Sequence, residues 1–172
     1  MADNLSRLVA MFEEADDVCR PGRDDASRAR DYYDGKQLSP EQIKALNKRK
    51  QPLVIENLIQ PKVDYLCGLE RQTRTDPKAY PRTIGHDDVA NAATDALRYV
   101  ADDQSVDVKR SAVFQNMLVE GYGGVEVTAT QVRDAIDPVV INIEWERLFY
   151  DPHSSRPDFS DANYMGFITW MD

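Results

Sequence analysis

"LVIENLIQPKVDYLCGLERQTR", residues 53–74, is the stretch on which the predicted fold depends. Its apolar side chains recur every three or four residues, the spacing of one buried helix face. We expect a long core helix here, kinked at Pro61, because proline lacks the N–H that would donate to the carbonyl one turn earlier. The helix should bury its stripe against residues 87–120, so that replacing Leu66 by aspartate unfolds the chain. The stripe comprises Ile55, Ile59, Val63, Leu66 and Leu69.

Two further helical regions precede this stretch. Residues 1–33 have helical spacing at Leu5, Leu8, Val9 and Phe12, but Pro21-Gly22 should divide them into two short helices. After a turn at Asp34-Gly35, "SPEQ" (residues 39–42) supplies a cap, an N1 proline and a capping-box glutamine, so a helix should begin at Pro40. The cations "KRK" at its end are favoured by the helix dipole.

The second half of the chain should contain helices followed by strands. "KAYPRTI" (78–84) reads as an edge strand. Residues 87–103 and 106–120 are amphipathic helices, and "GYGG" (121–124) stops the second. "VEVTATQV" (125–132) and "PVVINIEW" (138–145) predict a hairpin, and "YMGFITWM" (164–171) adds a third strand to its sheet. The expected apolar faces of the two helices are Val89, Ala93, Ala96, Leu97 and Val100, and Val106, Val113, Met117 and Leu118.

These elements predict an α+β fold with one domain, residues 1–172. Its sub-parts are a mainly helical 1–84, a helix pair in 85–122 and antiparallel strands in 123–172. No apolar run reaches the 18 residues needed to span a membrane, and the start is too acidic for a signal peptide. Cys19 and Cys67 are isolated in sequence, and we expect reduced thiols.

The net charge of −9 is unevenly distributed. Residues 1–86 hold 15 basic and 14 acidic side chains, whereas residues 87–172 hold 6 and 16. The acidic half should repel nucleic acid, so any DNA contact must be local.

The search for a catalytic or metal site gives weak candidates. Asp151, His153, Asp158 and Asp161 could offer oxygen ligands to a divalent cation, but a turn-rich connection in which Asp151 and Ser160 cap turns accounts for them as well. His86 and His153 lie in different loops, and Glu144 and Glu146 should share one solvated strand face. The glycines of "GYGG" lack the lysine and hydroxyl of a phosphate-binding loop. We therefore expect no enzyme, cofactor or metal.

Three stretches carry a resemblance to a known family. They are "YYDGKQLSPEQIKALNKRKQPLVIENLIQPKVDYLCGLERQTRTDPKAYPR" (32–82), "NMLVEGYGGVEV" (116–127) and "WERLFYDPHSSRPDFSDANYMGFITWMD" (145–172). In this order they resemble the portal proteins of tailed bacteriophages, in the P22-like podovirus branch.

The resemblance implies a structural subunit of a ring, typically of twelve copies, at one capsid vertex of a phage or prophage. Terminase would pump double-stranded DNA through the ring, and the DNA would later leave through it. Implied partners are further copies of the chain, the terminase large subunit, scaffold, capsid and tail adaptor proteins. The implied location is the virion, with assembly in the host bacterial cytoplasm. We expect this chain to be a wing fragment that lacks the stem, clip and crown regions.

Two roles are possible for a set of six basic residues: Lys44, Lys48, Arg49, Lys50, Arg71 and Arg74. They could pair with the acidic half, within a subunit or across a ring interface, which we favour because ring contacts join different surfaces of the same chain. They could instead touch DNA. The alternatives to a portal role are a free-standing protein binding metal or ligand through residues 151–161, and a small DNA-binding module using residues 44–50.

Overall fold

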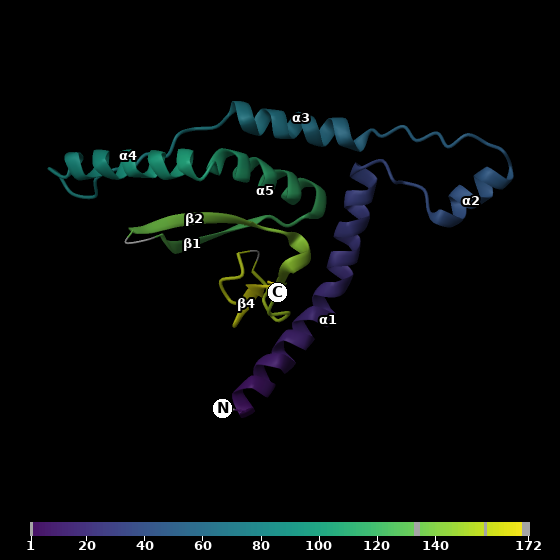
Figure 1. Cartoon of the computed structure of the whole chain (residues 1–172), viewed down its shortest axis with the longest axis horizontal. Coiled ribbons are helices and arrows are strands. Elements are labelled where there is room, and N and C mark those ends of the chain that lie inside the picture. Colours follow the sequence, from purple (N-terminus) through teal and green to yellow (C-terminus); the bar gives the residue numbers. More distant parts are fainter. Residues whose placement is uncertain (1, 133–134, 157, 170–172) are drawn as a thin grey trace.

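The computed structural model describes residues 2–132, 135–156 and 158–169 (Figure 1). Helices and two antiparallel two-stranded sheets confirm the predicted α+β class. The helices are α1 (Ala2–Tyr33), α2 (Pro40–Lys48), α3 (Ile59–Gln72), α4 (Asp87–Asp103), α5 (Val106–Glu120) and the short 3-10 helix η1 (Trp145–Arg147). The strands are β1 (Gly124–Val132), β2 (Ala135–Ile143), β3 (Leu148–Tyr150) and β4 (Met165–Phe167).

Helix α1 is continuous, so the predicted break at Pro21-Gly22 is wrong. Pro21 removes the helical hydrogen bond to the Asp17 carbonyl. The Arg23 side chain donates to the neighbouring carbonyl of Asp16, 3.1 Å away. Tertiary packing on both sides of the proline holds the helix together, because α1 contacts α5 and α3 as well as η1 and β3.

The buried face of α1 also differs from the predicted one. Leu5, Leu8 and Val9 are exposed. The buried residues of α1 recur at spacings of four and seven, so they share one face of the helix. Most of them are small, which lets neighbouring elements approach closely. They are Ala15, Cys19, Ala26 and Tyr33.

Helix α2 confirms the capping-box prediction. The Ser39 hydroxyl accepts from the N–H of Gln42 at 3.2 Å, and the Gln42 side chain accepts from the N–H of Ser39 at 2.8 Å. No residue of α2 is buried. Local hydrogen bonding therefore defines this helix without tertiary support.

Helix α3 is shorter than predicted. Residues 53–58 lie outside it, because Asn57 Oδ1 accepts from the N–H groups of Ile59 and Gln60 and so caps the helix start. Pro61 consequently occupies the first turn, where its missing N–H costs nothing, and the expected kink is not needed. The predicted stripe is also misplaced: Cys67 is the buried residue of α3, while Leu66 is 42% exposed.

Helices α4 and α5 follow one another through a tight turn at Ser105, whose φ of 48° is left-handed. Both helices were predicted, but α4 buries Ala90 and Thr94 rather than Val89 and Leu97. The Thr94 hydroxyl accepts from the N–H of Ala79 at 3.0 Å. The predicted strand at 78–84 is therefore wrong: part of this segment lies against α4, and none of it pairs in a sheet.

The chain reverses after α5 as predicted. Gly121 ends the helix with a φ of 83°, and a Cβ on Gly123 would lie 2.5 Å from the Val113 carbonyl oxygen, so glycine is required there. Strands β1 and β2 then form the predicted hairpin, and β2 contacts α5.

The third predicted strand exists, as β4, but it pairs with β3 in a separate sheet. This small sheet packs on α1 through an edge-to-face contact of Phe12 with Phe149 at 5.2 Å. The Tyr164 hydroxyl also donates to the Met11 carbonyl at 3.1 Å. Residues 170 and 171 of that predicted strand lie outside the described part.

The elements form an open arrangement rather than a sphere (Figure 1). Helices α3, α4 and α5 lie along one side of the hairpin, α1 runs away from them, and α2 stands apart at the end opposite α4. In the described residues, no helix is both long and apolar enough to cross a membrane.

Candidate assembly surfaces

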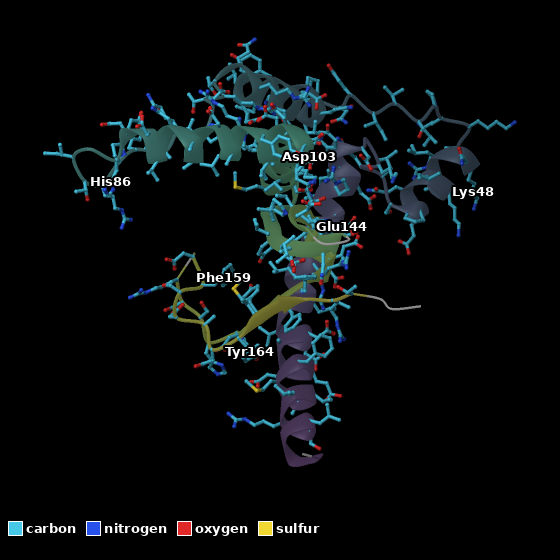
Figure 2. The ribbon with its side chains drawn as sticks, turned by 60° about the vertical axis from the view of Figure 1, so that its left-hand side comes forward. Lys48, His86, Asp103, Glu144, Phe159 and Tyr164 are labelled. Atoms are coloured by element: carbon cyan, nitrogen blue, oxygen red, sulfur yellow. The ribbon has the colours of Figure 1, made fainter. Side chains whose placement is uncertain are left out.

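The six predicted basic residues occupy two separate places. Lys44, Lys48, Arg49 and Lys50 belong to α2 and its C-terminal end, whereas Arg71 and Arg74 lie on or just after α3. Figure 2 shows Lys48 at the outer edge of the molecule. The sequence grouped these residues by charge, and the structure does not bring them together.

Arg74 belongs to a network that fixes α3 to α5. Its Nε and Nη2 donate to the two oxygens of Glu70 at 3.0 and 2.9 Å, and it also contacts the Ser111 hydroxyl. Arg71 donates to the same hydroxyl at 3.4 Å, and Arg110 lies 3.2 Å from Glu70. The hydrogen bonds from Arg74 lower the pKa of Glu70 to about 2. Arg71 and Arg74 thus make contacts within the subunit.

The predicted basic residues of α2 have a different environment. In the part of the chain that the structure describes, no carboxylate lies within ion-pairing distance of Lys44, Lys48, Arg49 or Lys50. These cations are available to another molecule.

A polar junction at Tyr33 joins the end of α1 to α3 and α5. The Tyr33 hydroxyl donates to Asp64 at 2.7 Å and accepts from Gln115 at 2.8 Å, and the hydrogen bond to Asp64 is the main cause of the raised pKa of Tyr33. The Asn57 side chain donates to the Tyr33 carbonyl at 2.7 Å. Sequence reasoning missed this junction, although an asparagine two residues before a helix is a typical cap signal.

A second junction ties α1 to the end of α5. Arg30 Nε donates to Glu120 at 2.6 Å, and its Nη2 donates to Asn116 at 3.1 Å. The Glu120 side chain is 1% exposed, and burial raises the pKa of this carboxyl although Arg30 opposes the shift. A charge buried this deeply depends on its partner.

Two carboxylates shape the loop of residues 151–163. The buried Asp151 accepts from the N–H of His153 at 2.9 Å and from the N–H and side chain of Asn163 at 3.0 and 2.7 Å. Asp161 accepts from Ser154, Ser155 and Arg156. The backbone hydrogen bond from His153 is the main cause of a pKa of about 2 at Asp151. The hydrogen bonds that these two carboxylates accept therefore come from within the loop.

The loop differs from the prediction at Ser160, which was expected to cap a turn. Asp151 caps a turn as expected, but Asp158 also caps one by accepting from the N–H of Ser160, whose own hydroxyl accepts from Arg156. Asp158 therefore has a structural partner.

The other candidate groups lie apart. His86 and His153 belong to different regions (Figure 2 labels His86), and Glu144 and Glu146 lie at and within η1 rather than on one strand face. Within residues 2–132, 135–156 and 158–169, no three His, Cys, Asp or Glu side chains are placed to hold a metal ion. Cys19 and Cys67 are buried free thiols.

The surface of the chain is large for its mass. Its accessible area is 13441 Å², whereas a compact monomer of 19.6 kDa exposes roughly 8600 Å². Many large apolar side chains are exposed on α1, α4, the hairpin and the segment before α3. Examples are Leu8, Val54, Leu58, Val89, Leu97, Val127 and Ile136.

The fold and its contacts define a class of protein. Its charged side chains hold elements together, and its apolar surface remains uncovered, as in a structural subunit that is completed by assembly. The family model for phage P22-like portal proteins matches residues 9–172, and the chain therefore belongs to that family. Membership gives it a structural role in the portal, the head-to-tail connector of the virion, where the family forms a homo-oligomeric ring at a capsid vertex. A search of curated proteins found no match.

Proposed function

We propose that this chain is the outer wing part of a portal subunit, in a ring through which terminase packages double-stranded DNA and through which the DNA is later ejected. The subunit performs no chemistry of its own. Contacts with scaffold, capsid and tail adaptor proteins belong to the same proposal, as does assembly in the host cytoplasm.

The observation that carries this proposal is the exposed area. An excess of about 5000 Å² over a compact monomer is more than one standard interface, which buries about 800 Å² of each partner. A ring subunit has two neighbours and further partners, so it needs several such surfaces. Family membership supports the same conclusion.

A portal role also agrees with the charge of the chain. A DNA channel must let a polyanion slide without binding tightly, and the chain carries 30 acidic against 21 basic residues. The uncovered cations on α2 are the exception, and we assign them to contacts between subunits rather than to DNA.

The assembly state of the purified chain tests the proposal. Native mass spectrometry at micromolar concentration should show one closed oligomer of defined copy number, stable to dilution. A monomer at every concentration would contradict the proposal.

A DNA-binding module is the competing function, and a second measurement separates the two. In a filter-binding assay at two salt concentrations, binding to duplex DNA that falls steeply with salt and depends on Lys48, Arg49 and Lys50 would favour that module. We expect no such binding by the assembled chain.

A further inference from the structure

Residues 36–58 form an arm whose ion pairs and side-chain hydrogen bonds to the rest of the described chain lie at its base, at Lys36 and Asn57. None of these residues, all of which the structure describes, is buried. The arm contains α2 and the extended segment that follows it, and its two ends meet at the Tyr33 junction, where Asn57 donates to the Tyr33 carbonyl. A loop that is anchored only at its base and carries a capped helix with no buried residue leaves its outer surface free to contact another molecule.

The chemistry of the arm indicates what it contacts. Its extended segment exposes Leu53, Val54 and Leu58, with Val54 79% exposed. The arm also carries five basic and two acidic residues, for a net charge of +3, whereas the rest of the chain holds 16 basic and 28 acidic residues. Lys36 pairs with Asp31 and Asp34 at the base of the arm, whereas the four cations of α2 and its C-terminal end are unpaired within the described residues. An apolar strip beside these four cations calls for a surface that is both apolar and acidic.

Helix α4 presents such a surface. It holds five aspartates and one arginine, for a net charge of −4. Its buried residues are Ala90 and Thr94, so the apolar stripe containing Val89, Ala93 and Leu97 is turned away from the core and stays exposed. The stripe that was predicted to face the core is therefore uncovered in this chain.

The arm and α4 lie at opposite ends of the molecule. Figure 1 shows α2 and α4 at the two ends of its longest axis, and Figure 2, turned by 60°, again separates Lys48 from His86, the residue before α4. One chain cannot join its own arm to its own α4. Two complementary surfaces at opposite ends of a subunit are the requirement for a head-to-tail ring contact.

We propose that the arm of one subunit docks on α4 of the next copy of this chain, with Leu53, Val54 and Leu58 against the Val89–Leu97 stripe and the α2 cations against the α4 aspartates. The inference rests on the proposed function, because it names the two surfaces that meet in the ring.

Cysteine crosslinking tests the contact. The variant with Val54→Cys and Leu97→Cys, treated with a bismaleimide, should give covalent dimers, trimers and longer multiples on a denaturing gel. Both positions are exposed, and the native thiols are buried, so the single variants supply the background. An equimolar mixture of the two single variants should give dimers and nothing longer, because each chain then carries one half of the contact.

A matched variant keeps the test specific. Val54→Cys with Val127→Cys places the second cysteine at an exposed apolar residue of the hairpin. If that pair crosslinks instead, or if the untreated protein forms rings and the Val54–Leu97 pair gives no multiples, the inference is overturned while the proposed function stands. If native mass spectrometry shows no ring for the unmodified chain, the proposed function fails first and the inference fails with it.

Discussion

Arg30 supplies the cation that pairs with the buried carboxylate of Glu120, whose side chain is 1% exposed in the native chain. Replacing Arg30 by alanine removes that cation. Because Arg30 itself is partly exposed, we expect a loss of about 2 kcal/mol in the free energy of unfolding, below the value for a fully buried pair. Urea denaturation measures this loss.

Arg28 provides the control, since it lies on the same helix and makes an exposed pair with Asp25 at 3.7 Å. Arg28→Ala should change stability by less than about 0.5 kcal/mol. Adding Glu120→Gln to Arg30→Ala should recover part of the loss. An equal loss of stability in the two arginine variants would show that the Arg30–Glu120 pair stabilises the chain no more than the exposed Arg28–Asp25 pair does.

Asp151 should make the stability of the 151–163 loop dependent on pH. Its pKa of about 2 lies below the usual 3.9 for aspartate, so the stabilisation is fully present above about pH 4 and is lost as the pH falls toward 2. Thermal melting of the native chain and of Asp151→Asn should therefore differ most near neutral pH and converge toward pH 2. A melting difference that is constant from pH 6 to pH 2 would contradict this assignment.

At the scale of elements, the buried side of α3 is defined by Cys67. Replacing Cys67 by aspartate puts a carboxylate into the seam between α3 and α5 and should cost about 3 kcal/mol or unfold the chain. Leu66→Asp, at the neighbouring exposed position, should cost less than about 1 kcal/mol in the unassembled chain, contrary to the expectation from sequence. Circular dichroism melts of the two variants, compared at low protein concentration, decide which residue faces the core.

Elements with local signals could be predicted from the sequence. The capping box at Ser39 and Gln42 gave α2 its start, Gly121 gave α5 its end, and β-branched residues gave the hairpin. Elements governed by tertiary contacts could not. The continuity of α1 through Pro21 depends on packing along its whole length. The start of α3 was missed for a different reason, because the apolar spacing obscured a local cap at Asn57.

The buried faces were predicted poorly for a common reason. Periodicity shows that a helix has an apolar stripe, but not whether this chain or another one covers it. In α1 and α4 the large apolar residues stay exposed and smaller ones are buried. The candidate site had the same difficulty: charge alone grouped Lys48 with Arg74, although one projects outward and the other holds α3 to α5.

At the scale of the whole molecule, the separation of the arm from α4 explains both the shape and the excess area. A chain that buried its own apolar stripes would be rounder and could not present different surfaces at its two ends. In the proposed ring, assembly buries surface that folding leaves exposed, so the stability of the chain should depend on its concentration.

The hydrogen bond between Asn57 and the Tyr33 carbonyl also bears on how the length of the arm can be altered. Because it closes the base of the arm, the residues between can lengthen or shorten without moving α1 or α3. Doubling such a loop costs only about 0.6 kcal/mol in closure entropy. The arm is thus a place where a tag could be inserted with little disturbance to the folding of α1 and α3.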